Sequence, residues 1–292
     1  MAYAFVTPIV AMILCVQMHG DMVMFHYPRW SPDGRWLVLT TNVDGGADEE
    51  VWIVSKDGAT RRRLTSNDAG DTAADWAPDG RSIIFERQTP AGVKSLVMDL
   101  DGANVRDYVP DSQRLKQLRL MAGDLVVEER ATSDGQAVYV RDSNGNRRIG
   151  NARWSEQPAI SPDGRYVVFE EREDPHDILA SNIVLWDSKT NVSKIVSRGT
   201  DPSWSPDGNM LMFKVPGAKD ELQIVTFDVS TRGTRVVSAG VHPQFSPDGT
   251  EVVFMTNDPN RPDVYIVRVD GSAKRCLTCG WQSSAREAAP RR

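Results

Sequence analysis

The stretch Ser31-Pro32-Asp33-Gly34 recurs along this chain, and its recurrence decides the fold. Further copies begin at Ala77, Ser161, Ser205 and Ser246. The first residues of successive copies are 46, 84, 44 and 41 positions apart, and the second interval is about twice the others. A degenerate copy is therefore expected near residues 121–124. The mean spacing of about 43 residues predicts six repeats, each long enough for four strands.

Each turn is followed by short segments rich in β-branched and aromatic residues. The first of them reads WLVLT, SIIFE, YVVFE, MLMFK or EVVFM, and a second reads, for example, VWIVS, IVLWD or VYIVR. Such segments favour strands. Sheets that are apolar on both faces must pack against neighbouring sheets, and a radial ring buries every face. We therefore predict an all-β fold, a six-bladed β-propeller of four-stranded antiparallel blades, over residues 21–282.

The turn chemistry explains the repeated aspartates, which at first resemble candidate acids. Proline presets the backbone for the turn, and glycine accepts the positive φ that returns the chain to a strand. The Ser and Asp oxygens can accept hydrogen bonds from neighbouring backbone N–H groups. We interpret these aspartates as turn residues and the tryptophans before the turn as packing between blades: Asp33, Asp79, Asp163, Asp207, Asp248, Trp30, Trp76 and Trp204.

Composition and charge narrow the function classes. The 292 residues include 34 Lys and Arg against 40 Asp and Glu, a net charge of -6, so nucleic acid is not an expected partner. The chain has three cysteines and four scattered histidines, and we expect neither a cofactor nor a metal. Acidic loops near Asp48 and Glu173 lack the spacing of a dedicated calcium loop, although calcium stays an alternative. A monomer is expected.

Both ends of the chain are compositionally distinct. Residues 1–20 carry no charged side chain, and residues 4–16 form an apolar run that suits a signal peptide and is short for a membrane span. We expect export to the periplasm or the outside, with membrane association only through this segment if it is uncleaved. The segment lacks a basic start and a clear cleavage site, so a packed strand and a cytoplasmic location are the alternatives. Residues 283–292 are expected to be a flexible tail.

These motifs together resemble a known repeat. The pattern Pro-x-Trp-Ser-Pro-Asp-Gly, followed by an apolar strand ending in Phe and a closing Arg-x-Leu-Thr, is similar to the TolB-type, WD-like β-propeller repeat. The resemblance runs from about Tyr27 to Trp281. It implies a six-bladed propeller that serves as a periplasmic protein-binding platform. Because the first repeat begins within 30 residues of Met1, we expect no counterpart of the amino-terminal α/β domain of TolB.

Similar propellers also occur in prolyl-oligopeptidase-like and tricorn-like peptidases and in oligogalacturonate lyases. The chain contains no Gly-x-Ser-x-Gly nucleophile elbow and no cluster of histidines for a metal. We therefore expect a non-enzymatic scaffold that binds a protein or peptide on its variable-loop face, and we assign no catalytic residue. The alternative is a propeller enzyme or accessory subunit that acts on polysaccharide or peptide at the mouth of the central channel.

Two groups of residues on the variable-loop face are candidates for partner binding. One is a rim of Glu-Arg pairs at the ends of three strands: Glu86, Arg87, Glu129, Arg130, Glu171 and Arg172. Its functional interpretation is a docking patch, and the alternative is a set of ion pairs that satisfy one another. The other group flanks the innermost strands and could converge at the channel mouth: His26, Asp71, Asp201 and His242.

Cys276 and Cys279 form a Cys-x-x-Cys pair near the end of the last repeat. In an extended strand, residues three apart lie about 10 Å from each other, which is beyond disulfide reach. We expect two structural cysteines without a bridge. A disulfide is an alternative that requires the chain to turn at Thr278, and a metal site is another that requires ligands from elsewhere.

Overall fold

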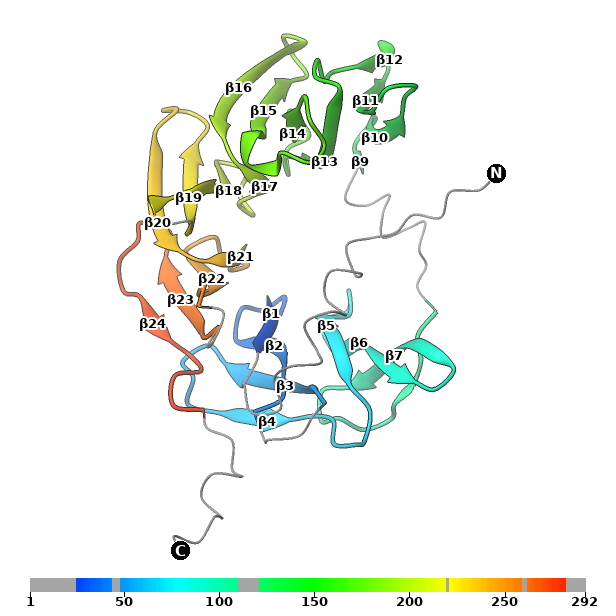
Figure 1. The fold of residues 1–292 in the computed structure, drawn as a ribbon, viewed down its shortest axis with the longest axis vertical. Coiled ribbons are helices and arrows are strands. Elements are labelled where there is room, and N and C mark those ends of the chain that lie inside the picture. The colour runs from blue at the N-terminus through cyan, green and yellow to red at the C-terminus, as the bar shows by residue number, and fades with distance from the viewer. Residues whose placement is uncertain (1–24, 44–47, 110–120, 219–220, 259–261, 282–292) are drawn as a thin grey trace, which may run out of the picture.

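The computed structural model describes residues 25–43, 48–109, 121–218, 221–258 and 262–281. Within these ranges the chain forms 24 strands and a single 3₁₀ turn, η1 (Ile178–Ala180). The strands pair antiparallel, except for a parallel bridge between Gln136 and Trp154. The all-β fold is confirmed (Figure 1).

Four sheets hold four strands each, hydrogen-bonded in chain order. The first sheet consists of β1 (Phe25–Trp30), β2 (Trp36–Thr41), β3 (Glu50–Ser55) and β4 (Arg61–Arg63). The second consists of β5 (Asp71–Trp76), β6 (Ser82–Thr89), β7 (Gly92–Asp99) and β8 (Arg106–Asp107). Another sheet consists of β17 (Thr200–Trp204), β18 (Met210–Pro216), β19 (Leu222–Asp228) and β20 (Thr234–Ala239). The last of the four consists of β21 (Val241–Phe245), β22 (Glu251–Met255), β23 (Val264–Arg268) and β24 (Arg275–Cys276).

The remaining eight strands form one larger sheet. They are β9 (Met121–Ala122), β10 (Leu125–Ala131), β11 (Gln136–Asp142), β12 (Gly145–Arg148), β13 (Trp154–Ile160), β14 (Tyr166–Arg172), β15 (Asn182–Asp187) and β16 (Val192–Arg198). The expected degenerate copy lies in the β9–β10 region, where Gly123 takes a φ of 59° between two short strands.

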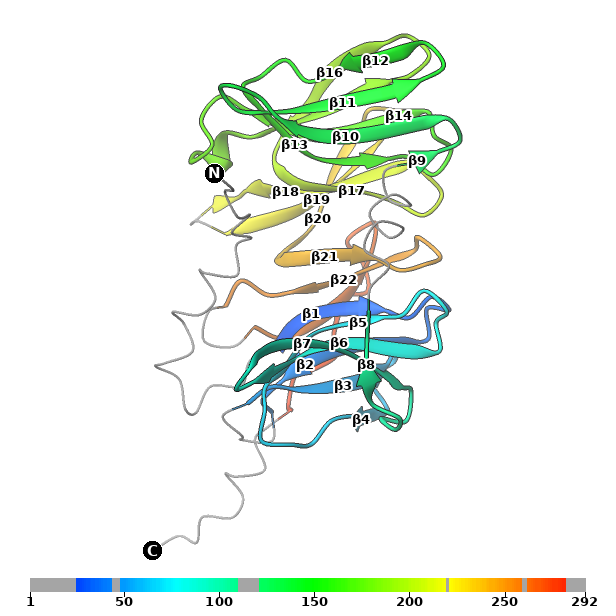
Figure 2. The ribbon, with the colours of Figure 1, turned by 90° about the vertical axis from the view of Figure 1, so that its right-hand side faces the viewer.

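The sheets stand side by side around a common centre, with β1, β5 and β21 running next to one another in Figure 2. Contacts run in series from the eight-stranded sheet through β17–β20, β21–β24 and β1–β4 to β5–β8. Figure 1 shows the described sheets as an open arc, with the opening between β5–β8 and β9–β10. The expected ring of six separate four-stranded blades is therefore found only in part. The link across the opening falls on residues 110–120, outside the described ranges.

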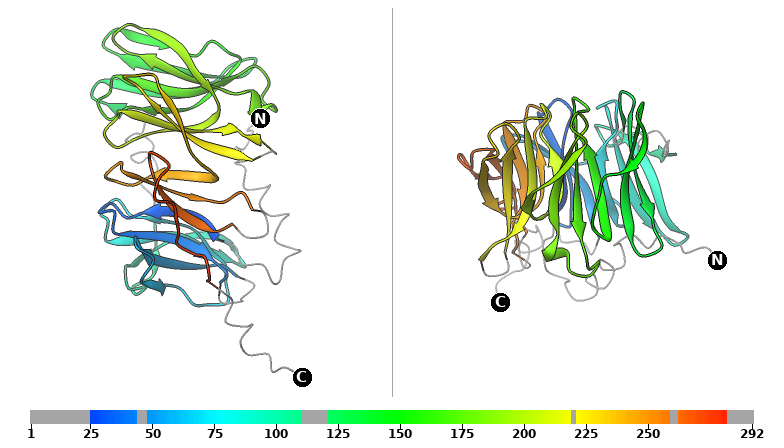
Figure 3. Two further views of the ribbon diagram at one scale, coloured as in Figure 1. Left: turned by 90° about the vertical axis from the view of Figure 1, so that its left-hand side faces the viewer. Right: turned by 90° about the horizontal axis from the view of Figure 1, so that it is seen from above.

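The repeated turn has the chemistry expected of it. In the first copy the Ser31 hydroxyl donates to Asp33 at 2.7 Å and accepts from the Trp36 N–H at 2.9 Å, while the Gly34 N–H donates to the Ser31 carbonyl at 2.9 Å. The bond from Ser31 is the main cause that holds the pKa of Asp33 below its ordinary value. These aspartates thus close turns at one end of the strands, and the variable loops lie at the opposite face (Figure 3).

The residues before the turns pack between neighbouring sheets, as expected. The Trp76 indole N–H donates to the Arg29 carbonyl of the β1–β4 sheet at 3.1 Å. The Trp204 indole N–H likewise donates to the Ala159 carbonyl at 3.0 Å. Trp30 is buried among apolar residues of β22 and β23. The core is therefore a series of apolar layers between sheets, which is how each sheet covers both of its faces.

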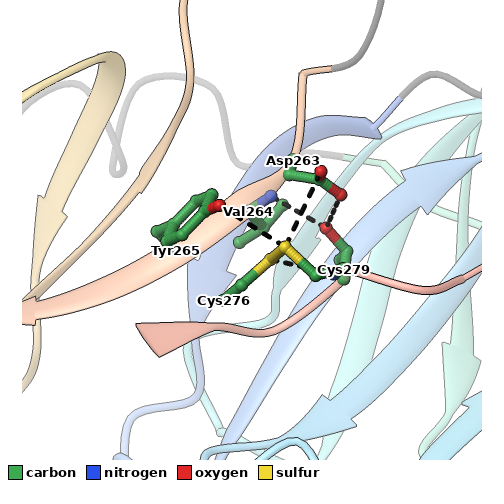
Figure 4. The surroundings of a disulfide bond; sticks show 6 residues. Asp263, Val264, Tyr265, Cys276 and Cys279 are labelled. Carbon is green, nitrogen blue, oxygen red and sulfur yellow. Dashed lines mark hydrogen bonds between the residues drawn. A yellow bond between two sulfur atoms is a disulfide. The ribbon is translucent and has the colours of Figure 1, made fainter. Parts of the chain in front are cut away.

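Cys276 and Cys279 form a disulfide, which corrects the expectation of two unbridged cysteines. Their Cα atoms lie 5.6 Å apart, because the chain leaves β24 after Cys276 and turns. The Thr278 hydroxyl donates to Asp263 at 2.8 Å, and the Trp281 N–H donates to the Thr278 carbonyl at 2.9 Å. The turn at Thr278 that a bridge requires is thus present (Figure 4).

The expected signal peptide, residues 1–20, and the expected flexible tail, residues 283–292, lie outside the described residues. Searching the described ranges for a helix with the length and apolar character of a membrane span finds none.

Candidate functional site

Five strands that lead into the repeated turn carry the same β-bulge. At each bulge a residue other than glycine takes a φ between 44° and 54°: Tyr27, Ala73, Gln157, Asp201 and His242. All five lie four residues before the first residue of the turn. The left-handed conformation costs about 1–2 kcal/mol for such residues, so the surrounding structure must hold it in place.

Carboxylates from adjacent strand sets hold two of these bulges. The Gln157 N–H donates to Glu129 at 2.5 Å, and the Asp201 N–H donates to Glu170 at 2.5 Å. Each bond joins a bulge to the strand set that precedes it in the chain. The bulges are therefore part of the contact between neighbouring sheets as well as of their own strands.

The bulge residues differ in chemistry although their backbone is repeated. Ala73, Gln157, Asp201 and His242 are exposed, and Tyr27 is half-buried. The same backbone conformation therefore places a different side chain at the surface of each sheet. Tyr27, Asp201 and His242 belong to the neighbouring β1–β4, β17–β20 and β21–β24 sheets, whereas Gln157 belongs to the eight-stranded sheet.

Tyr27 and His242 connect two of these sheets. Their rings lie 4.6 Å apart between centroids and meet edge to face. His26, next to Tyr27, places its Nε2 atom 3.0 Å from a Glu49 carboxylate oxygen, and the Thr40 hydroxyl donates to the other Glu49 oxygen at 3.0 Å. A histidine–carboxylate pair therefore stands directly beside the aromatic contact.

Lys214 and Asp201 form an ion pair next to His242. Burial lowers the pKa of His242 to about 4, and the Lys214 charge lowers it further while Asp201 opposes the shift. His242 is exposed to solvent, and charged groups from other strands, including Arg29 and His26, also act on its pKa. At neutral pH it is therefore a neutral imidazole, which can both donate and accept a hydrogen bond.

Glu170 lies beneath Asp201 and is almost fully buried. Burial raises the pKa of Glu170 to about 7, against the opposing effects of the Asp201 N–H bond and the Arg172 cation. Arg172 lies 3.6 Å from Glu170 and 2.5 Å from Glu156. A carboxyl group that titrates near neutrality, beside an accessible aspartate, is a feature of functional sites.

These residues form a continuous polar group across four strand sets, which we name the channel-mouth arc: His26, Tyr27, Glu49, Glu170, Asp201, Lys214 and His242. Its accessible members can contact a ligand, while Glu170 and Lys214 support them from below. Hydrogen-bonding groups, the carboxylate of Asp201 and an aromatic ring are thus available within one surface.

Of the four residues expected at the channel mouth, the structure brings three together. His26 and Asp201 both act on the pKa of His242. Asp71 lies apart in the β5–β8 sheet. It is fully buried, and Arg87 donates two hydrogen bonds to its carboxylate, at 2.7 and 2.8 Å.

The expected rim residues are engaged within the molecule to different degrees. Arg172 and Glu171 are buried, and the carboxylate of Glu171 accepts hydrogen bonds from the N–H groups of residues 151 and 152. Arg130 pairs with Glu128 at 2.6 Å and is half-exposed. A docking role for Glu86, Arg87, Glu129, Arg130, Glu171 and Arg172 stays a prediction.

Sequence reasoning did not place Tyr27, Glu49, Glu170 or Lys214 at this site, and it considered Glu49 and Glu170 only as members of acidic loops. A signal for the bulges was present, because Tyr27, Gln157, Asp201 and His242 each precede a proline and stand four residues before the turn. Glu49 and Lys214 carried no such signal. They reach the arc from other strands or loops of the folded chain.

The opposite face has a hollow of its own, about 870 Å³ in volume, between the β1–β4 and β21–β24 sheets. Glu251 holds it together, with Lys56 at 2.7 Å and Arg275 at 2.8 Å. The Lys56–Glu251 pair links the two sheets, and the pKa values of Asp33 and Asp248 at this hollow are lowered mainly by hydrogen bonds within their own turns.

Comparison with known proteins identifies the family. The model described as the TolB beta propeller domain matches residues 16–190, more than half of the chain. The chain belongs to the TolB beta propeller domain family. This confirms the resemblance stated from the repeated turn and strand pattern.

Some of the proteins that this TolB-family chain resembles carry the names of enzymes. A Bacillus subtilis (strain 168) protein named uncharacterized peptidase YuxL is 29% identical over 159 residues, which span 52% of this chain and 23% of that protein. The AtxE2 isopeptidase structure has a TM-score of 0.55 at 14% identity and covers 82% of this chain and 44% of that one. TolB from Acinetobacter baumannii has a TM-score of 0.49 at 17% identity and covers 91% and 67%.

The expectation of a non-enzymatic scaffold is contradicted by these findings, because a relative by sequence bears the name of a peptidase. The matched segment is 23% of the length of that relative. The missing nucleophile elbow argues against one type of catalytic serine in this chain, and it does not argue against a role as part of an enzyme.

Proposed function

We propose that this chain is the propeller part of a peptide-processing enzyme and that it binds peptide at the channel-mouth arc. The observation that carries the proposal is the arc itself, in which accessible Tyr27, Asp201 and His242 lie over a buried carboxyl group with a pKa of about 7. The sequence likeness to a protein named a peptidase supports peptide as the substrate class.

The arc suits the groups of a peptide backbone. Neutral His242 donates to a carbonyl or accepts from an amide, and the Asp201 carboxylate accepts from an amide or an ammonium group. The Tyr27 ring offers an apolar face to a side chain. Because the bulges fix the backbone under these residues, binding does not require that the site be ordered first.

In this proposal the arc binds and orients the peptide, and the residues that break the peptide bond are supplied by another domain or another chain. The missing Gly-x-Ser-x-Gly elbow is consistent with this division of roles. Holding a substrate in a reactive geometry is itself a large catalytic contribution.

The test is direct binding of peptides to the intact chain. Fluorescence anisotropy with a labelled peptide mixture should show saturable binding that falls at least tenfold in His242→Ala and in Asp201→Asn. Matched controls are His176→Ala and Asp107→Asn, which change exposed residues away from the arc and should bind as the parent does. Equal loss in the controls, or no loss in the arc variants, would refute the site.

We also propose that the sheets close into a ring of six four-stranded blades. The series of contacts between neighbouring sheets and the six-fold repeat of the sequence support this. A crystal structure should then have the β5–β8 sheet packed against β9–β12. A crystal structure that keeps the opening would overturn closure.

We propose further that the protein works outside the cytoplasm. The Cys276–Cys279 disulfide supports this, because such bonds persist mainly in oxidising compartments. Amino-terminal sequencing of the protein from its native host should find a start near residue 20. An intact Met1 on soluble cytoplasmic material would overturn it.

A further inference from the structure

The turn that contains the disulfide has features of its own. It reads Cys276-Leu277-Thr278-Cys279-Gly280, and Gly280 takes a φ of 84°. The Cys279 N–H points at the Cys276 sulfur at 2.8 Å. The turn therefore brings the backbone of Cys279 against the sulfur of Cys276.

A third group faces the two sulfurs. Asp263 lies directly before β23, and one of its oxygens accepts the bond from Thr278 while the other lies 3.8 Å from the Cys279 sulfur. The two Sγ atoms and a carboxylate oxygen all lie within 4.8 Å of one another (Figure 4). The Asp263 side chain is 7% exposed, so the fold holds it in this place.

We propose that reduction of the disulfide turns this site into a zinc site, with Cys276, Cys279 and Asp263 as ligands. Two thiolates and a carboxylate are ligands that Zn²⁺ accepts, and a water molecule would complete a tetrahedron. The disulfide and the metal-bound form exclude each other, because bridged sulfurs cannot be thiolate ligands. The turn therefore has two closed states, one covalent and one held by an ion.

In the reduced turn, the positions of the two cysteines and Asp263 favour a bound Zn²⁺ ion over two free thiols. Two sulfurs at about 2.3 Å from one Zn²⁺ lie about 3.8 Å apart, so side-chain rotation on the existing turn is enough to separate them. Asp263 already stands beside Cys279. A carboxylate held next to two thiolates repels them, and a divalent cation removes that repulsion.

Reduction of the disulfide takes two thiol–disulfide exchange steps, and Zn²⁺ binding follows. A thiolate of an external dithiol attacks the exposed Cys279 sulfur, and Cys276 leaves as a thiolate. The second thiol of the reductant then attacks the mixed disulfide and releases Cys279, so two electrons pass to the protein and the reductant becomes a disulfide. Binding of Zn²⁺ then displaces up to two thiol protons, because free thiols are largely protonated at pH 7.

The site also lies next to a packing contact between the first and the last sheet. Trp281, two residues after Cys279, packs against Phe25 and Trp52 at 5.5 and 5.6 Å between centroids, with Arg61 over its ring at 4.8 Å. Either closed state of the turn keeps Trp281 at this contact. The open, reduced form without an ion would lose that constraint.

The experiment uses the full chain with Cys15→Ser, so that only Cys276 and Cys279 carry sulfhydryls. The protein is reduced with a phosphine, desalted, and titrated with Co²⁺ and then with Zn²⁺. We expect a thiolate-to-cobalt charge-transfer band, one ion per chain and displacement of Co²⁺ by Zn²⁺. The oxidised protein should show no band.

Substitutions assign the ligands. Asp263→Asn should weaken Zn²⁺ binding at least tenfold in a chelator competition, while Asp270→Asn, which changes an exposed carboxylate in the same hairpin, should not. Circular dichroism of both oxidised variants checks that they are folded. Absence of the cobalt band in the reduced parent overturns the proposal, and so does an Asp263→Asn variant that binds as Asp270→Asn does.

Discussion

At the scale of single residues, the neighbours of a side chain decide what it can do. Glu170 and His242 lie on either side of Asp201, and burial shifts the pKa of both toward the uncharged form. Glu170 titrates near pH 7, whereas His242 is neutral above about pH 4. Within one arc, the pKa of the acid Glu170 is thus raised and the pKa of the base His242 is lowered. Environments that push the pKa values of neighbouring groups in different directions are typical of acid–base sites.

Glu170 gives the protein a pH-dependent stability. Its pKa rises from 4.5 to about 7 on folding, so between these values the folded protein holds a proton that the unfolded chain has released. The free energy of unfolding therefore falls as the pH rises through this window, by up to about 3 kcal/mol. Urea denaturation at pH 5 and pH 8 should show a smaller fall in Glu170→Gln than in the parent.

Other groups titrate in the same range, so the control for this prediction is Glu221→Gln, which changes an exposed glutamate. That variant should keep the pH dependence of the parent. The effect of His242 on the free energy of unfolding has the opposite sign. Because its pKa falls from 6.5 to about 4 on folding, the stability that it contributes is lost as the pH falls through that range. A fall in stability that is equal in Glu170→Gln and the parent would disprove the assignment to Glu170.

The Arg87–Asp71 pair should matter more than the Arg130–Glu128 pair. Asp71 is fully buried, so Arg87→Leu leaves an uncompensated buried charge and should destabilise the protein by about 3 kcal/mol. Both partners of the Arg130–Glu128 pair are more than a third exposed, and Arg130→Leu should cost less than about 1 kcal/mol. Urea midpoints of the two variants measure the difference, and similar midpoints would contradict it.

At the scale of elements, the bulge before the turn is a repeated device that fixes where a strand presents its side chain. It offsets the pairing of β1 with β2 between His26 and Arg29, and of β21 with β22 between Val241 and Gln244. The accessible residue of each bulge stands out of the ladder and is free to differ from sheet to sheet.

Ala73 allows the backbone strain of the bulge to be measured without losing a functional group. Its φ is 52°, which glycine adopts without strain, so Ala73→Gly should leave stability unchanged or raise it by up to about 1 kcal/mol. Ala137, buried in β11 without a positive φ, is the control, and Ala137→Gly should destabilise by about 1 kcal/mol. Thermal unfolding compares them, and equal losses would show that the bulge is unstrained.

At the scale of the whole molecule, stability is shared between sheets because each sheet covers its neighbours. Val253, Met255, Val264 and Ile266 of the β21–β24 sheet lie in the same apolar cluster as Trp52 of the β1–β4 sheet. No sheet of this kind is stable alone, so loss of one exposes the faces of two others.

Removal of the chain from Val241 onward should therefore give insoluble protein and not a smaller folded arc. It removes the β21–β24 sheet and exposes apolar faces of β1–β4 and β17–β20. Truncation after Trp281 is the control, because it keeps every described contact of that sheet. The soluble fraction after expression measures the outcome, and a soluble, cooperatively unfolding product of the long truncation would contradict it.

The sequence by itself determined the features that depend on neighbours in the chain. The turn chemistry of Ser, Pro, Asp and Gly is local, and a repeat of about 43 residues whose strands are apolar on both faces leaves few folds other than stacked four-stranded sheets. The turn role of Asp33 and the packing role of Trp76 and Trp204 followed from this, as did the family.

The tertiary structure alone decided the site. Tyr27 meets His242 because sheets from opposite ends of the chain pack side by side, and the Asp201 N–H meets Glu170 because β17 packs against the preceding sheet. No spacing in the sequence encodes such meetings, nor the burial that shifts the pKa of Glu170. The Cys276–Cys279 bridge likewise depended on where the chain leaves β24, since two cysteines three residues apart can pair in a turn but not in a strand.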